Sequence, residues 1–430
     1  MKIILKKINL LNPEFNINQK EIDILLIDGK ISKIGNLSKE DFEEGECFDF
    51  TGKYVVPGFF DMHVHLREPG REDEETVLTG CNAAANGGFT GIACMPNTEP
   101  AIDNAEVVEF IKKQSSNHLV DVFVIGAATQ GRKGEVISPM AELFEAGVVG
   151  FSDDGVAIKT SGILRKAFEY SQMYNLPIIE HCEDESLAGG AMNESLNSTM
   201  LGLPPIPSLA EELIVARDVM MAEYTGGKIH IAHISSKKSV EIVRIAKQKR
   251  IQVTSEVTPH HFSLTDDEIK SYDTNFKMNP PLRTREDIYA ILSGLKDGTI
   301  DCIASDHAPH SPEEKEAEFE LAPNGIIGLE TEIGLALTEL YHKNILSLEN
   351  LVEKMSINPR KILNIPIPKF EIGEFANFTI LDLNDIWTVD LSKSKSKSKN
   401  SPFDKKLLTG KPVAVINKGQ MFYKDKFMKI

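Results

Sequence analysis

The sequence lacks a long apolar run, and no stretch approaches the ~18 uninterrupted apolar residues of a membrane helix. Positive charge is also scarce, because 47 lysines and arginines stand against 64 acidic residues, for a net charge of -17. This balance argues against a nucleic-acid-binding surface and against binding to an anionic membrane. The first eleven residues predict a strand rather than a signal peptide.

Cysteine is sparse as well. The five cysteines are scattered, and no two of them form a C-x-x-C pair. An odd, unpatterned set without an export signal predicts reduced thiols and a cytoplasmic protein. Cys182 stands beside His181, but adjacent residues of a strand point to opposite faces, so we do not expect both to bind the same ion.

Two kinds of pattern divide the chain into two predicted domains. Residues 1–52 and 366–430 contain short apolar runs separated by polar or glycine turns, which is typical of strands. Over residues 53–365, strand-like apolar runs alternate with segments that carry apolar residues at helical spacing. We predict an α/β fold: a (β/α)8 TIM-like barrel inserted into a small β-sandwich domain that both chain ends form. The expected barrel strands are Tyr54–His65, Gly88–Met95, Asp121–Ala127, Gly147–Phe151, Leu176–His181, Lys228–His233, Ile251–Val257 and Ile300–Ser305.

A repetitive tract of alternating serine and lysine spans Ser392–Lys399. One interpretation is a basic patch, and the other is a flexible loop exposed to solvent. The low-complexity polar composition favours the loop, because such a segment has little apolar surface to bury.

Histidine and aspartate gather where predicted strands end. His63 and His65 are separated by one residue, so on a strand both point to the same face and can hold one cation. The active groups of a parallel barrel lie at the C-terminal ends of its strands. Four further strands end in such residues: Asp153 and Asp154, His181, His233, and Asp306.

These residue types indicate a metal site. Imidazole and carboxylate groups suit Zn²⁺, or another borderline divalent ion, better than Ca²⁺ or Mg²⁺. Six ligands are too many for one tetrahedral ion, so we predict two ions bridged by a carboxylate and a hydroxide. Only one of the adjacent Asp153 and Asp154 can face that site. His230 lies an odd number of residues from His233, so we expect it to face away and to be structural.

The order of these motifs resembles the amidohydrolase superfamily and, within it, the bacterial class I dihydroorotases. The most specific segments are HVHLREPG at residues 63–70 and DHAPH at residues 306–310, and further matches extend across the barrel. The resemblance implies two metal-binding groups that Asp154 bridges. One group contains His63, His65 and Asp306, and the other contains His181 and His233.

The resemblance also implies a reaction, the reversible cyclisation of N-carbamoyl-L-aspartate to L-dihydroorotate in pyrimidine (UMP) biosynthesis. In the hydrolytic direction, the bridging hydroxide attacks the ring amide, and Asp306 carries a proton to the leaving nitrogen. Arg67 would bind the substrate carboxylate, because its planar fork suits two parallel hydrogen bonds. The remaining substrate contacts implied are Asn97, Asn279, His310 and Gly325. One departure is Asn324, where the family usually has an aromatic residue.

Two alternatives stay open at this point. A dihydropyrimidinase, hydantoinase or allantoinase would share the barrel and the metals, but these enzymes generally bridge the metals with a carboxylated lysine. An inactive homologue that supports a carbamoyltransferase would typically lack some metal ligands, and none is missing here. The resemblance further leaves open a homodimer and an association with aspartate carbamoyltransferase.

Overall fold

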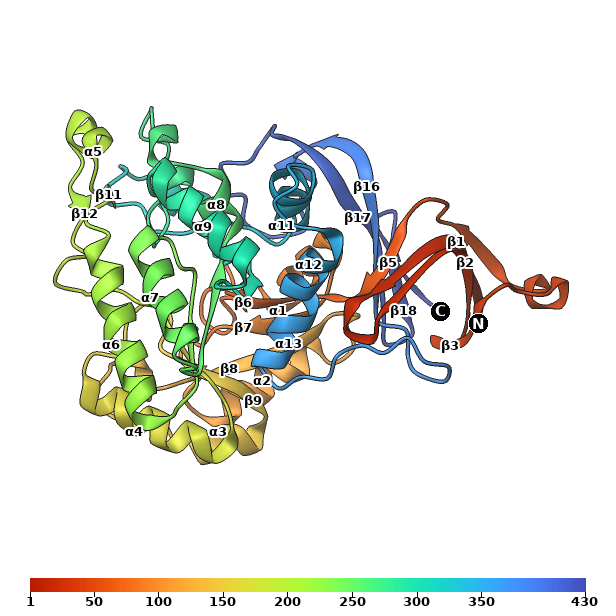
Figure 1. Cartoon of the computed structure of the whole chain (residues 1–430), viewed down its shortest axis with the longest axis horizontal. Coiled ribbons are helices and arrows are strands. Elements are labelled where there is room, and N and C mark those ends of the chain that lie inside the picture. The colour runs from red at the N-terminus through yellow and green to blue at the C-terminus, as the bar shows by residue number, and fades with distance from the viewer.

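The computed structural model describes all 430 residues, and two β-sheets of different kinds dominate it. Eight parallel strands follow one another in chain order around a nearly closed barrel, which confirms the predicted fold class. A separate nine-stranded sheet joins strands from both chain ends and lies to one side of the barrel (Figure 1). No helix combines the length and the apolar character that crossing a bilayer would need.

The barrel strands are short and mostly buried. They are β6 (Phe59–Val64), β7 (Phe89–Cys94), β8 (Asp121–Ala127), β9 (Val148–Ser152), β10 (Ile178–Glu180), β13 (Ile229–Ile231), β14 (Val253–Val257) and β15 (Cys302–Ile303). The longer helices that cover them are α1 (Val77–Gly87), α2 (Ala105–Ser115), α3 (Met140–Ala146), α4 (Ser161–Ser171), α6 (Leu209–Thr225), α7 (Lys237–Gln248) and α9 (Arg285–Asp297). Shorter helices and strands fill the connections: α5 (Leu196–Leu201), α8 (Pro259–Ser263), α10 (Pro312–Lys315), α11 (Glu332–Ala336), α12 (Leu348–Val352), α13 (Asn358–Ile362), β11 (Met192–Asn193) and β12 (Pro205–Ile206).

Polar caps fix where several of the covering helices begin. Thr76, Asn104, Thr160 and Ser236 each precede a helix, and each side chain accepts a hydrogen bond from a backbone N–H of the first turn. Such a cap contributes about 1 kcal/mol, because it satisfies a donor that the helix itself leaves free. The barrel strand that precedes each of these helices therefore ends at a defined place on the rim of the barrel.

The predicted strand Tyr54–His65 is wrong in one respect, because the chain changes sheets at Gly58. β5 (Tyr54–Pro57) pairs with strands of the terminal sheet, whereas β6 begins the barrel. A Cβ at position 58 would lie 2.1 Å from Asn377 Oδ1 and 2.1 Å from Thr90 Oγ1. Only glycine fits where the two sheets meet this closely.

The terminal sheet brings the two chain ends together. Its strand order is β19-β18-β17-β16-β5-β1-β2-β3, with β4 paired to β1. Its remaining members are β1 (Lys2–Asn12), β2 (Ile17–Ile27), β3 (Lys30–Gly35), β4 (Glu46–Asp49), β16 (Phe378–Thr388), β17 (Leu407–Asn417), β18 (Gln420–Tyr423) and β19 (Lys426–Lys429). A core of 17 buried residues belongs to this sheet and its connections. The barrel is thus inserted between two halves of one sheet.

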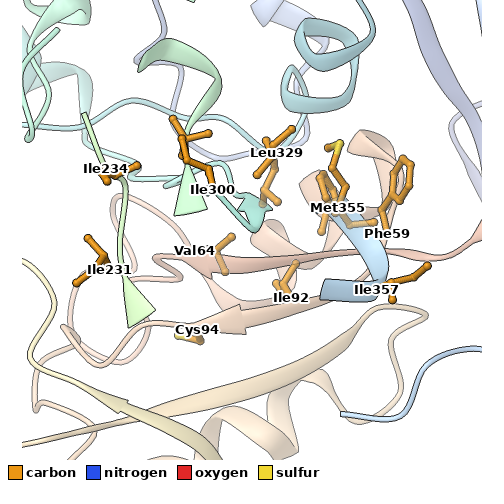
Figure 2. Packing of buried hydrophobic residues seen from close by; sticks show 14 of the residues in the cluster. Phe59, Val64, Ile92, Cys94, Ile231, Ile234, Ile300, Leu329, Met355 and Ile357 are labelled. Atoms are coloured by element: carbon orange, nitrogen blue, oxygen red, sulfur yellow. The ribbon is translucent and has the colours of Figure 1, made fainter. Parts of the chain in front are cut away.

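A cluster of 65 buried residues joins the barrel strands to the helices around them. Figure 2 shows Phe59 of β6 packed near Met355 and Ile357, and Val64 lying near Ile92 of β7. Each large side chain buried in this way contributes about 1.5–3 kcal/mol. This packing makes the strand ends a rigid support for polar side chains.

The barrel closes between its first and last strands. Val64 pairs with His307 through an isolated bridge, and the His65 N–H donates to the His307 carbonyl oxygen at 2.9 Å. The ends of β6 and β15 therefore lie side by side. Closure brings His65 next to Asp306 although the two are far apart in sequence.

The Ser392–Lys399 tract lies against the barrel, so the prediction of a solvent-exposed loop is wrong. Ser396 and Ser398 are each 2% exposed, whereas Lys397 and Lys399 face solvent. Alternate residues point inward, as on a strand. The buried serines are stabilised by hydrogen bonds to Glu75 and to the backbone of Glu74 instead of by apolar contacts.

Candidate active site

Six side chains converge at the C-terminal rim of the barrel. Each comes from the end of a strand or from the residues directly after it, and each is no more than 7% exposed. They are His63, His65, Asp154, His181, His233 and Asp306. The barrel therefore brings together the six residues predicted as metal ligands.

Asp154 lies at the centre of this group. Its Oδ1 is 3.3 Å from His63 Nε2, and its Oδ2 is 3.5 Å from His65 Nε2. The same Oδ1 is 3.8 Å from His181 Nδ1 and 3.7 Å from His233 Nε2. Two triads of donor atoms result, each with all atoms within 4.8 Å of one another, and Asp154 belongs to both.

Unpaired buried atoms in the same group fit a bound cation. His63 Nε2 and Asp154 Oδ1 are both buried without a hydrogen-bond partner. An orphaned polar group of this kind costs about 1–3 kcal/mol, more when it is charged. Imidazole and carboxylate donors suit a divalent metal, and an ion between them would satisfy both atoms. Burial alone would raise the pKa of Asp154, but the charge of His63 holds it well below its usual range.

Asp153 points away from the histidines. Its carboxylate accepts hydrogen bonds from the backbone N–H of Thr129, at 2.9 Å, and from the Thr129 hydroxyl. Burial raises the pKa of Asp153. Of the two adjacent aspartates, only Asp154 lies among the clustered histidines.

Asp306 is a second carboxylate close to His63 and His65. Its Oδ1 is 3.0 Å from His65 Nε2 and 3.6 Å from His63 Nε2. Burial would raise the pKa of Asp306, but the hydrogen bond from His65 and the charge of His63 lower it. An ionised carboxylate in this position can accept a proton.

Glu256, in the middle of β14, supports the site and was missed by the sequence analysis. Its Oε1 is 2.5 Å from His63 Nδ1, and its Oε2 is 3.2 Å from His230 Nε2. Burial opposes ionisation, but His63 and His230 lower the pKa of Glu256 to about 2. His230 is structural, yet the expectation that it faces away is wrong, because it shares this carboxylate with His63. The signal was an acidic residue inside an otherwise buried strand.

Two of the predicted substrate contacts also lie against histidines of the six-residue cluster. Asn97 Oδ1 is 2.7 Å from His65 Nδ1. Asn279 Nδ2 donates to Glu183 Oε2 at 2.9 Å and lies 3.3 Å from His181 Nε2. Both asparagines line the cavity above the six side chains.

Arg67 is held at the edge of the same cavity. Its Nε donates to the Pro309 carbonyl at 3.1 Å and lies 3.0 Å from Glu74 Oε2. One terminal nitrogen, Nη2, is 3.5 Å from His310 Nε2, and Nη1 has no protein partner. The guanidinium is therefore fixed through Nε, while its outer edge remains available to an anion.

The cavity has a volume of about 210 Å³ and is lined almost entirely by polar residues. Its lining includes all five residues predicted to contact substrate: Arg67, Asn97, Asn279, His310 and Gly325. Five of the six clustered side chains line it as well, all except His63. A small polar molecule in this cavity would contact the predicted substrate-binding residues and the clustered histidines and aspartates at the same time.

The loop with the unusual Asn324 approaches this cavity through its backbone. The Asn324 carbonyl oxygen lies 2.8 Å from His310 Nε2, a contact that does not depend on an aromatic side chain. Gly325 has a φ of 133°, and a Cβ there would lie 2.7 Å from the Ala308 Cβ. Glycine is required at this position both for its conformation and for space.

Known proteins resemble this chain over its full length. Residues 52–239 match a family model described as Dihydro-orotase-like. The chain is 47% identical to a dihydroorotase of Pelotomaculum thermopropionicum, with all of both chains covered. It is also 47% identical to a dihydroorotase of Acetivibrio thermocellus, over 99% of this chain and 100% of the relative.

Solved structures of similar fold include related hydrolases. An L-hydantoinase (dihydropyrimidinase) from Arthrobacter aurescens matches with a TM-score of 0.87 and 28% identity, over 100% of this chain and 97% of the other. A dihydropyrimidinase from Brevibacillus agri matches with a TM-score of 0.86 at 20% identity, over 100% of this chain and 96% of the other. The second likeness concerns the fold alone.

Proposed function

Because the chain belongs to the dihydroorotase family, we propose that its cavity interconverts L-dihydroorotate and N-carbamoyl-L-aspartate. The protein is an enzyme that acts on cyclic amides. One observation carries the assignment of the site: two donor triads that share Asp154 open on the same cavity as the free edge of Arg67. Metal-binding groups and a carboxylate-binding cation are what this substrate needs.

We assign two divalent ions to the six side chains, and the donor set favours Zn²⁺. One ion would be held by His63, His65 and Asp306, the other by His181 and His233, and Asp154 would contact both. When bound, such a pair supplies a Lewis acid for the amide carbonyl and a water-derived nucleophile at neutral pH.

Asp306 moves the proton in this scheme. In the hydrolytic direction its carboxylate accepts a proton from the attacking water and delivers it to the ring nitrogen as the amide bond breaks. Its lowered pKa keeps the carboxylate ionised before each turnover. In the cyclising direction it takes the proton from the carbamoyl nitrogen, which attacks the side-chain carboxyl carbon, and then gives that proton to the departing oxygen, so that the C–O bond breaks and water leaves.

The remaining residues orient the substrate. Arg67 offers Nη1 and Nη2 to the ring carboxylate, in a chain whose net charge of -17 otherwise repels anions. Asn97 and His310 line the same cavity as that cation and complete the carboxylate contacts. Asn279 and the Gly325 backbone offer hydrogen bonds to the ring amide groups.

A second candidate is hydrolysis of an uncharged cyclic amide, which the likeness to an L-hydantoinase supports. Such a substrate has no carboxylate to meet the outer edge of Arg67, so Nη1 would stay without an acceptor although Nε is paired with Glu74. The test is steady-state kinetics with L-dihydroorotate and with dihydrouracil on one metal-loaded preparation. We expect kcat/KM to favour L-dihydroorotate at least about a hundredfold. Equal turnover of dihydrouracil would contradict the proposal.

Location and assembly belong to the same proposal. We place the enzyme in the cytoplasm, where its five free cysteines, four of them buried, stay reduced. A homodimer and an association with aspartate carbamoyltransferase remain predictions. Light scattering of the purified protein, alone and mixed with the carbamoyltransferase, tests both.

A further inference from the structure

The segment Ser394–Asn400, which we call the serine strap, leaves the terminal sheet between β16 and β17 and lies on the barrel rim. Ser396, Ser398 and Asn400 are no more than 5% exposed. The strap contains no apolar residue, so polar contacts hold it in place. None of its residues lines the cavity above the six clustered side chains.

The strap binds two carboxylates of the barrel, the buried Glu75 and the half-buried Glu330. Glu330 accepts hydrogen bonds from the Ser394 hydroxyl and, at 2.8 Å, from the Lys395 N–H. Glu75 accepts from the Ser396 hydroxyl and, at 3.0 Å, from the Lys397 N–H. Each carboxylate also has a hydrogen-bond partner in the barrel, Asn86 for Glu330 and Thr79 for Glu75, so the contacts join the two domains.

Glu75 connects the strap to the residue after Asp306. The Gly328 N–H donates to His307 Nδ1 at 3.1 Å, so the ring proton lies on Nε2, which donates to Glu75 Oε2 at 3.2 Å. The His307 backbone in turn bonds to His65. Ser396 and Asp306 are thus joined through a short chain of buried contacts.

Asn400 makes the most direct connection to the cavity. Its Nδ2 donates to the Ala308 carbonyl at 2.9 Å and to the Gly325 carbonyl at 3.1 Å. Its Oδ1 accepts from the His310 N–H at 3.2 Å, and its carbonyl oxygen accepts from the Ile327 N–H at 2.9 Å. One residue therefore cross-links two irregular loops, 308–310 and 325–327.

We propose that Asn400 is a positioning residue that sets the distance between these two loops and so places His310 and Gly325 against the substrate carboxylate and ring. The inference rests on the proposed function, because it assigns His310 and Gly325 to substrate binding. The loops already meet at one isolated bridge between His307 and Ile326, and the Ala308 N–H donates to the Ile326 carbonyl at 2.8 Å. Asn400 extends this contact to His310 and Gly325. Loss of the amide weakens substrate binding and leaves the proton transfer by Asp306 largely intact.

The test compares Asn400→Ala with Asn384→Ala, an exposed asparagine of β16 in the same domain. The full-length, metal-loaded proteins are assayed for kcat and KM with L-dihydroorotate. We expect Asn400→Ala to raise KM about tenfold, as the loss of buried hydrogen bonds would do, with kcat within threefold of wild type. Asn384→Ala should match wild type. If Asn400→Ala does not fold, Asn400→Asp, which keeps the acceptor for the His310 N–H but loses both donors, is measured instead.

Hydrogen–deuterium exchange of the same proteins gives a second readout that does not need turnover. In the Asn400 variant, exchange should accelerate across residues 306–310 and 324–328, while β7 stays as protected as in wild type. Unchanged exchange in those loops would overturn the proposal, and so would a fall in kcat at constant KM. A wild-type protein that does not turn over L-dihydroorotate would refute the proposed function, whereas the exchange result still decides the cross-link.

Discussion

Glu256 and His63 form a buried hydrogen bond of 2.5 Å that turns the Nε2 atom of His63 toward Asp154. The carboxylate fixes the imidazole orientation and makes it a better ligand. His230 holds the other oxygen of Glu256 at 3.2 Å. The orientation of His63 therefore depends on Glu256, which is not one of the six clustered side chains.

Replacing this carboxylate tests that relationship. Glu256→Gln should lower the affinity for metal about 10- to 100-fold, because His63 loses its charged partner. Titration of the metal-free protein with Zn²⁺ measures the change. Glu286→Gln, at a side chain that is 81% exposed, is the matched control. Equal affinities for both variants and wild type would rule out the supporting role of Glu256.

Arg67→Met should raise KM for L-dihydroorotate by about 30- to 100-fold, since a charged hydrogen-bonding partner of the carboxylate is lost. Bound metal should stay at the wild-type level, because Arg67 contacts none of the six clustered side chains closely. Arg67→Lys should have a KM between those of wild type and Arg67→Met, because lysine keeps the positive charge but lacks the planar guanidinium group. The solvent-exposed Arg165→Met provides the control. Unchanged kinetics in Arg67→Met would remove Arg67 from the substrate site.

Asp154 and Asp153 offer a paired comparison at adjacent positions. Asp154→Asn should lose bound metal, because both donor triads contain this carboxylate. Asp153→Asn should keep its metal and lose only thermal stability, since its partner is Thr129. Elemental analysis and thermal unfolding distinguish the two. Full metal occupancy in Asp154→Asn would contradict a bridging role.

The positions of the four histidines and Asp306 could be predicted from sequence because two simple rules apply to them, whereas the choice of Asp154 over Asp153 rests on the resemblance to the dihydroorotases. Residues two apart on a strand share a face, which pairs His63 with His65, and parallel strands end at one rim. An acidic residue in a buried strand indicates that Glu256 has a polar partner, but the sequence does not identify that partner, because His63 is distant along the chain. His230 was misplaced because alternation was extended past the strand end at Ile231, where His233 already has a φ of 30°.

The serine strap shows a different limit. Its low-complexity polar composition is typical of disordered segments, and that composition by itself predicts a solvent-exposed loop. The spacing itself was informative, because serine and lysine alternate with the period of a strand, which places Ser396 and Ser398 on one face. The sequence does not show that Glu75 and Glu330 lie where they can accept hydrogen bonds from the strap.

Asp306→Asn should reduce kcat by about a hundred- to ten-thousandfold, the usual contribution of a positioned acid–base group. The amide can neither accept the proton from water nor return it to nitrogen. Metal content measured on the same sample separates loss of proton transfer from loss of a ligand. A variant that retains more than a small fraction of wild-type kcat would contradict the acid–base assignment.

The most direct test of the central claim is metal content together with turnover of L-dihydroorotate, measured on one purified sample before and after chelation. We predict divalent metal at up to two equivalents per chain, turnover that disappears when the metal is removed, and recovery on adding Zn²⁺. Metal at these levels without turnover of L-dihydroorotate would contradict the account and direct attention to another cyclic amide. Turnover that survives complete removal of metal would contradict the role given to the six side chains.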